Sequence, residues 1–278
     1  LALGWTARRQ GWRPGLAWGA GGLVVVLLLA QAMGVLAQPR GSGPDAAMST
    51  GLRILRHYDI VGAVAHDPNL KLEAIARANP KAVAVIQAES PKVYSPERVD
   101  FLDRSPALGT ALWLTPEAAI SAQWFELILD HPAAYMSHRW DAFVQVLINP
   151  VLERCNPVFV GVEAPAARLE LLQITAGREP SDMAISNYAT WWYVTPFYSH
   201  LAFAAAALIV AGFLIVRREA ADMVIAALML GVLAFTASFF VVSIACDYRY
   251  LYALDLAAMA GLLYLALDPP VLRSAGRA

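Results

Sequence analysis

Two long stretches without a charged residue constrain this sequence more than any other feature. Twenty-six uncharged residues separate Arg13 from Arg40, and twenty-four separate Asp222 from Asp247. A helix needs about 20 apolar residues to cross the roughly 30 Å hydrocarbon core of a bilayer. Only 15% of the residues are charged, against about 25% in an average soluble domain. The chain is therefore predicted to be a mainly α-helical, polytopic membrane protein.

Charge placement predicts the topology of this protein. We expect four transmembrane helices, near residues 16–37, 198–216, 223–246 and 250–267. Arginine clusters precede the first span and follow the second and fourth: Arg8, Arg9 and Arg13; Arg217 and Arg218; Arg273 and Arg277. Positive loops stay in the cytoplasm. This predicts a cytoplasmic lead and first span (1–37), a mostly helical extracytoplasmic domain (38–197), three further spans (198–267) and a cytoplasmic tail (268–278).

Aromatic residues favour the same topology, because Trp and Tyr gather where a membrane meets water. They cluster before the second span and between the third and fourth: Trp191, Trp192, Tyr193, Phe197 and Tyr198; Tyr248, Tyr250 and Tyr252. The Ala-rich composition is typical of a bacterial genome, so we expect a bacterial inner membrane. Because Leu1 is not methionine, we also expect the C-terminal part of a longer chain.

The composition argues against several partners and cofactors. Net charge is −1 and no run of Lys or Arg occurs, so nucleic acid is not an expected partner. The two cysteines, Cys155 and Cys246, both fall on the outer side, where a disulfide is permitted. Two free thiols are the simpler expectation. No Cys/His spacing predicts a zinc site. We expect no cofactor, although a full-length enzyme could use a divalent cation outside this segment.

The outer domain begins with a Gly, Pro and Ser-rich linker over residues 38–50. Capping residues followed by proline and an acid predict helix starts at Ser95-Pro96-Glu97 and Thr115-Pro116-Glu117. Apolar spacing extends the second of these helices through Ile120, Trp124, Leu127 and Ile128. Two more helices are expected over 52–64 and 70–78, and the β-branched run 81–87 favours one strand.

The segment from His131 to Asn149 is the most informative part of the domain. At 100° per residue, His131, Tyr135, His138 and Arg139 share one face. The opposite face is apolar and is expected to be buried: Met136, Trp140, Phe143, Val144 and Leu147. The polar stripe would then line a cleft and suit an anionic ligand, because arginine presents a planar fork of donors. The alternative is a solvated face on which Arg139 pairs with Asp130 or Asp141.

Two acids outside that helix are also candidates for a site. Asp247 and Arg249 fall in the short turn before the last span, where they could bind a lipid phosphate. Alternatively, Arg249 neutralises Asp247 or the intramembrane Asp255. Asp59 lies early in the outer domain, where it could bind sugar hydroxyls or pair locally with Arg56.

Three segments resemble the C-terminal region of bacterial polytopic glycosyltransferases of the GT-C type. They are Tyr58 to Gly62 (YDIVG), Trp124 to Trp140 (ending ILDHPAAYMSHRW) and Cys246 to Tyr252 (CDYRYLY). The resemblance implies sugar transfer from a polyprenyl-phosphate donor to a glycan or lipid acceptor on the outer membrane face. It also implies that Arg249, Arg139 and His138 contact the phosphate. The acid in the first outer loop of that family has no match here, so either it lies upstream of Leu1 or the activity is absent.

The sequence also allows two functions other than sugar transfer. One is a non-catalytic, membrane-anchored domain that binds a protein or an envelope glycan. The other is a transporter fragment, which is disfavoured because the interiors of the first three spans hold no ionisable residue.

Overall fold

The computed structural model describes residues 46–149, 152–155, 157–217 and 219–267, together with isolated helical positions between 13 and 33. Within this part the chain is mainly helical and no strand is present. The predicted span near 16–37 falls largely outside the described residues, as do most of the predicted linker and the tail from residue 268. The fold class is confirmed as mainly α, and α3 already begins at Ala46, inside the predicted linker.

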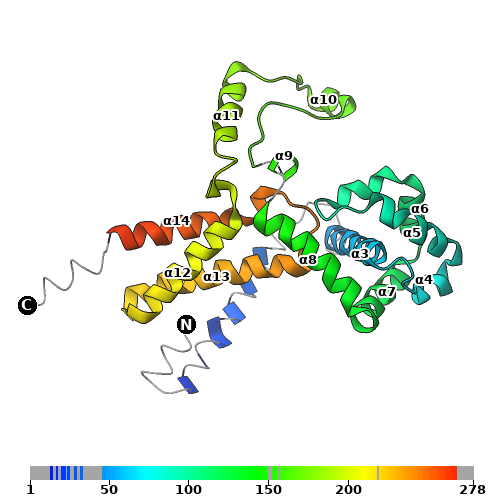
Figure 1. The fold of residues 1–278 in the computed structure, drawn as a ribbon, viewed down its shortest axis with the longest axis horizontal. Helices are drawn as coiled ribbons and strands as arrows, with labels where there is room; N and C mark the ends of the chain where they lie inside the picture. The colour runs from blue at the N-terminus through cyan, green and yellow to red at the C-terminus, as the bar shows by residue number, and fades with distance from the viewer. Residues whose placement is uncertain are drawn as a thin grey trace, which may run out of the picture.

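A compact helical unit occupies one end of the molecule (Figure 1). It consists of α3 (Ala46–His66), α4 (Glu73–Ala78), α5 (Pro80–Val93), η1 (Val99–Arg104), α6 (Pro106–Leu114), α7 (Glu117–Asp130) and α8 (Pro132–Ile148). The long α3 packs against α5, α7 and α8. Its contacts form an apolar core that includes Tyr58, Ile60, Val61, Val64, Ile75, Ile86, Leu108, Leu112, Ile120 and Leu127.

Three local predictions in this unit are wrong. Residues 81–87 form part of helix α5, because Pro80 fits the first helical turn and Ala82, Ile86 and Ser90 bury one helical face. No helix starts at Pro96, since the Ser95 hydroxyl accepts from the Glu97 N–H in a turn and the next helix begins at Val99. The helix expected from residue 70 begins only at Glu73.

The start of α7 is as predicted, but Thr115 does not cap it. The Thr115 hydroxyl instead donates to the Ala111 carbonyl at 2.7 Å, so it closes the preceding helix, and Pro116 leads into Glu117. Proline fits here because the first N–H of a helix has no partner within the helix.

Among the residues that the structure describes, three helices are long and apolar enough to cross a membrane. They are α12 (His200–Arg217), α13 (Ala220–Val242) and α14 (Tyr252–Leu267), which follows η3 (Tyr248–Leu251); the spans have mean hydropathy of 2.1, 2.5 and 1.6. At most 33% of any span is buried within the protein, so most apolar side chains face outward. The chain is thus built as a membrane protein.

The third predicted span was extended too far. α13 ends at Val242, and the following residues run beside the start of η1 instead of continuing the helix. Val99 N–H donates to the Ile244 carbonyl, and Cys246 N–H donates to the Glu97 carbonyl, both at 2.8 Å. These bonds tie the end of the span to the helical unit.

Helix α8 connects the helical unit to the spans. Its first turns pack on α3 and α7, and its later turns pack on α12 and α13, where Phe143 meets Phe240 at 5.8 Å between ring centres. A disulfide between Cys155 and Cys246 adds a covalent link. The expectation of two free thiols is therefore wrong: the turn after α13 brings Cys246 beside Cys155, seven residues after the end of α8.

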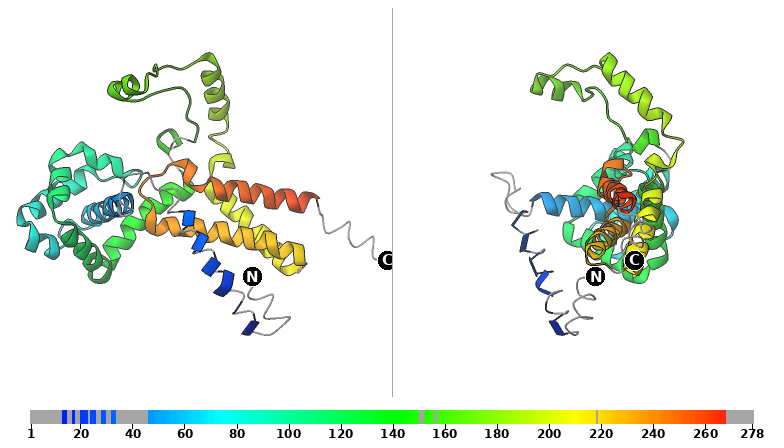
Figure 2. Two further views of the ribbon diagram at one scale, coloured as in Figure 1. Left: turned by 180° about the vertical axis from the view of Figure 1, so that it is seen from behind. Right: turned by 90° about the vertical axis from the view of Figure 1, so that its left-hand side faces the viewer.

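Residues 157–198 form an arm that stands away from both parts (Figures 1 and 2). The short α9 (Leu152–Cys155) precedes it, and it contains α10 (Ala166–Leu172), α11 (Pro180–Trp191) and η2 (Pro196–Tyr198). No residue of α10 is buried, and α11 buries only Ala189.

Candidate functional site

Asp59, His138 and Arg139 meet in the interior of the helical unit, and each is 0% exposed. The His138 Nε2–H donates to Asp59 Oδ1 at 3.0 Å, and the Trp124 indole donates to Asp59 Oδ2 at 2.6 Å. Arg139 forms an ion pair with the same carboxylate. Its other amino group donates to the Ser243 carbonyl at 2.8 Å, so this cluster joins α3, α7 and α8 to the end of α13.

The protonation of His138 follows from its two partners. Burial lowers the pKa of His138 below its usual value, so the imidazole is neutral near pH 7. Its Nδ1 lies 3.0 Å from the Tyr94 hydroxyl. The tautomer that satisfies both contacts carries its proton on Nε2, facing Asp59, and accepts from Tyr94 at Nδ1. Tyr94, His138 and Asp59 thus form a continuous hydrogen-bonded chain that runs from the partly exposed Tyr94 to the fully buried His138 and Asp59.

The predicted orientation of α8 is wrong for its first half. Tyr135, His138 and Arg139 are buried, whereas Met136 and Trp140 on the face expected to be internal are 49% and 60% exposed. The other residues of that face, Phe143, Val144 and Leu147, are partly buried. The polar face can be internal because Asp59 compensates the Arg139 charge. Asp141, an expected partner of Arg139, instead lies 3.3 Å from His66.

The other two residues of the polar stripe, Tyr135 and His131, lie in different surroundings. Tyr135 belongs to the cluster, with the Arg139 guanidinium 5.9 Å from its ring centre. His131 precedes the first residue of α8 and is partly exposed, away from the buried cluster. Arg56 pairs with Glu117 at 2.5 Å, so the local Arg56–Asp59 pair considered from the sequence does not form.

Asp247 and Arg249 lie apart from this cluster and pair with each other at 3.0 Å. Asp247 also accepts from Arg98 at 2.6 Å, which fixes the turn on the helical unit. The Arg249 side chain remains 72% exposed. Asp255 pairs with His200 at 2.8 Å and not with Arg249. The pairing alternative is thus correct for Asp247 and wrong for Asp255.

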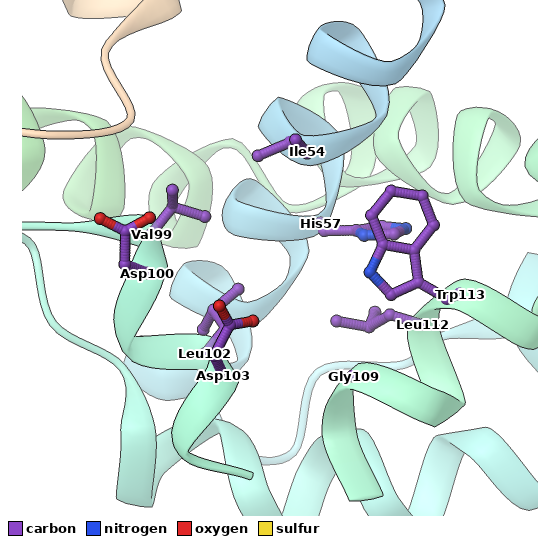
Figure 3. A pocket seen from close by; sticks show the side chains of 9 residues that line it. All are labelled: Ile54, His57, Val99, Asp100, Leu102, Asp103, Gly109, Leu112 and Trp113. Carbon is purple, nitrogen blue, oxygen red and sulfur yellow. The ribbon is translucent and has the colours of Figure 1, made fainter. Parts of the chain in front are cut away.

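A cavity of about 260 Å³ opens between α3, η1 and α6 (Figure 3). The rings of His57 and Trp113 lie on one side of it in an edge-to-face contact of 5.0 Å. The carboxylates of Asp100 and Asp103 lie on the other side. Burial, and then the charge of Arg53, lower the pKa of His57 to about 4, so the His57 imidazole is neutral at pH 7. Its apolar lining consists of Ile54, Val99, Leu102, Gly109 and Leu112.

Sequence reasoning missed this cavity, because its polar residues come from three elements and show no common motif. Two acids three residues apart at Asp100 and Asp103 were the one local signal.

Comparison with family models, curated proteins and solved structures finds no match to this chain.

The described residues show no group of three or more His, Cys, Asp or Glu side chains that could hold a metal ion. The cavity itself offers hydrogen bonding by the Asp100 and Asp103 carboxylates and ring stacking by Trp113.

Proposed function

We propose that this chain is part of an integral membrane glycosyltransferase of the GT-C type, which transfers sugar from a polyprenyl-phosphate donor on the extracytoplasmic face of a bacterial inner membrane. In this proposal a fourth span, near residues 16–37, precedes the helical unit. The unit then lies outside the membrane, on the ends of the spans.

The disulfide supports an outer position for the helical unit. Disulfides persist in oxidising compartments such as the periplasm and are rare in the cytosol. Cys155 and Cys246 are joined, and Cys246 lies in the turn between α13 and η3. Arg217, at the opposite end of α12 from the helical unit, agrees with a cytoplasmic location for that end.

The cavity at His57 and Trp113 is the observation on which the proposal depends. Carboxylates accept hydrogen bonds from hydroxyl groups, and the indole face of an exposed tryptophan can stack on the apolar face of a sugar ring. Asp100, Asp103 and Trp113 provide both on facing walls. A cavity of about 260 Å³ is of the size for a small ligand rather than a polymer.

The buried cluster is assigned a supporting role. Asp59, His138 and Arg139 have no exposed surface, so they position α8 and the end of α13 instead of contacting a substrate. Of the two arginines proposed from the sequence, Arg139 on α8 is buried and Arg249 in the turn before α14 is exposed. Arg249 therefore stays the candidate for contact with a lipid phosphate. Its partner Asp247 would hold it at the membrane surface.

Transfer of radiolabelled sugar from polyprenyl-phosphate donors tests the proposal. Membranes with the full-length gene should form a labelled product that membranes from a deletion strain lack. Trp113→Ala, Asp103→Asn and Arg249→Ala should each lose that product at unchanged expression, whereas Trp140→Ala, an exposed tryptophan outside the cavity, should retain it. Equal labelling in the deletion strain across several donors would overturn the proposal.

A second candidate is a membrane-anchored domain that binds an envelope glycan without chemistry. The burial of Asp59 favours this alternative. Asp59 is the acid that α3 places beside the polar face of α8, and it has no exposed surface with which to contact a substrate. In that case the purified protein should bind glycan fragments through Trp113, while sugar labelling stays equal in the two strains.

A further inference from the structure

We infer that α11 is an interfacial helix, which lies in the plane of the membrane surface with one apolar face in the lipid headgroup region. This inference depends on α12 being a membrane span, and it is independent of the proposed sugar chemistry.

One face of α11 is apolar. At 100° per residue, Ala184, Ile185, Tyr188 and Trp191 fall within an arc of about 120°, which also holds Ser181, and Trp192 caps the end of the helix. Asp182, Ser186 and Thr190 lie on the opposite side, together with Met183. No charged residue interrupts the apolar face. A helix at the boundary between lipid and water needs an apolar face of this kind.

The apolar face of α11 is not covered by the protein. Ile185 is 55% exposed, Tyr188 68% and Trp191 85%. A contiguous exposed patch of large apolar side chains indicates contact with another molecule or with a membrane. Trp and Tyr are the side chains that membrane interfaces favour, because their rings are apolar and their polar groups reach water.

The orientation of α11 selects the membrane as its partner. α11 runs across the direction of α12, α13 and α14 (Figure 1), and a view along the spans shows it extended sideways from their ends (Figure 2, right). The helix therefore lies parallel to the plane that the spans would cross. Eight residues separate Trp191 from His200, the first residue of α12, so the end of α11 lies close in the chain to the start of that span.

Aromatic contacts secure the connection between α11 and α12. Trp192 packs edge-on against Tyr188 at 6.0 Å and against Phe197 at 4.9 Å. The Tyr248 hydroxyl, in the turn before α14, donates to the Phe197 carbonyl at 3.1 Å. The end of α11 is thus held beside the ends of two spans, and its aromatic side chains lie where a headgroup layer would be.

Site-directed spin labelling of the full chain in phosphatidylcholine nanodiscs tests this inference. Both native cysteines are joined in the disulfide, so a single engineered cysteine labels selectively. Ile185→Cys and Trp191→Cys place labels on the apolar face, and Ser186→Cys on the same helix is the control. Labels at 185 and 191 should be several-fold more accessible to dissolved oxygen, relative to a water-soluble nickel chelate, than the label at 186.

Two results would overturn the inference. Equal nickel accessibility at 185, 186 and 191 would mean that α11 lies free in water. Protection of residues 185 and 191 from both reagents would mean that a protein covers this face. Because the polar face has no lysine or arginine, added phosphatidylglycerol should leave the accessibilities unchanged; a strong dependence would indicate electrostatic docking of a different surface.

Discussion

The backbone of Gly62 lies directly against the imidazole of His138. A Cβ atom at position 62 would stand 2.0 Å from His138 Nδ1, well inside any real contact. Glycine at this position therefore lets α3 and α8 approach closely enough for His138 to reach Asp59, one helical turn earlier on α3. The same ring contacts Tyr58 edge-on at 4.7 Å. Gly62 and His138 thus set the spacing of the two central helices.

Gly62→Ala should destabilise the helical unit, because either the imidazole must leave Asp59 or the two helices must separate. Overpacking of this kind costs about 1–3 kcal/mol, and more where a polar contact is also lost. The melting temperature in detergent should fall. Gly51→Ala, on the same helix with nothing within 4 Å of its added Cβ, should be neutral or slightly stabilising. Equal melting temperatures for the two variants would contradict the prediction.

Asp59→Asn should be strongly destabilising, because it leaves the buried Arg139 charge without its counter-ion. Removing one partner of a buried ion pair typically costs about 3–5 kcal/mol. Chemical unfolding measures the difference. The control is Glu117→Gln on α7. It removes the surface partner of Arg53 and Arg56, which lie on α3 as Asp59 does, and it should cost about 0–1 kcal/mol. Similar losses in both variants would mean that Asp59 does not compensate Arg139.

The sequence predicted those features of this fold that depend on local composition. A strongly apolar stretch long enough to cross a bilayer is visible in the sequence itself, so α12, α13 and α14 were placed to within a few residues. The helical character of 131–149 also follows from spacing alone. Spacing cannot tell which face of a helix is internal, and here the answer depends on Asp59, 79 positions before His138.

The sequence analysis also missed features that depend on contacts between residues far apart in the chain, because local spacing carries no information about such contacts. The run 81–87 has β-branched residues, but burial of Ala82 and Ile86 against α3 decides in favour of a helix. The cavity requires α3, η1 and α6 to be placed together before His57, Asp103 and Trp113 can face one another. The sequence analysis gave neither His57 nor Trp113 a role in a site.

Stability should depend on His57 in mildly acidic solution. The pKa of His57 is about 4 in the folded protein because of burial and the charge of Arg53, against 6.5 in the unfolded chain. As pH falls below 6.5, the unfolded state takes up a proton that the folded state does not. The folded protein thus loses up to about 3 kcal/mol by pH 4. Unfolding measured between pH 7.5 and pH 4 should show a shallower decline for His57→Gln than for the wild type, and parallel curves would refute this assignment.

Reduction of the Cys155–Cys246 disulfide should destabilise the junction between the helical unit and the spans. The bond closes a segment of 91 residues, for which the chain-entropy model gives a stabilisation of about 4–5 kcal/mol, and measured values often fall lower. Cys155→Ser and Cys246→Ser should each lower the melting temperature as much as the double variant, because either change breaks the same bond. Added reductant should lower the wild-type melting temperature towards that of the variants and leave theirs unchanged. Alkylation of both thiols in the native, unreduced protein would show that the bond does not form, and would also remove its support for an oxidising compartment.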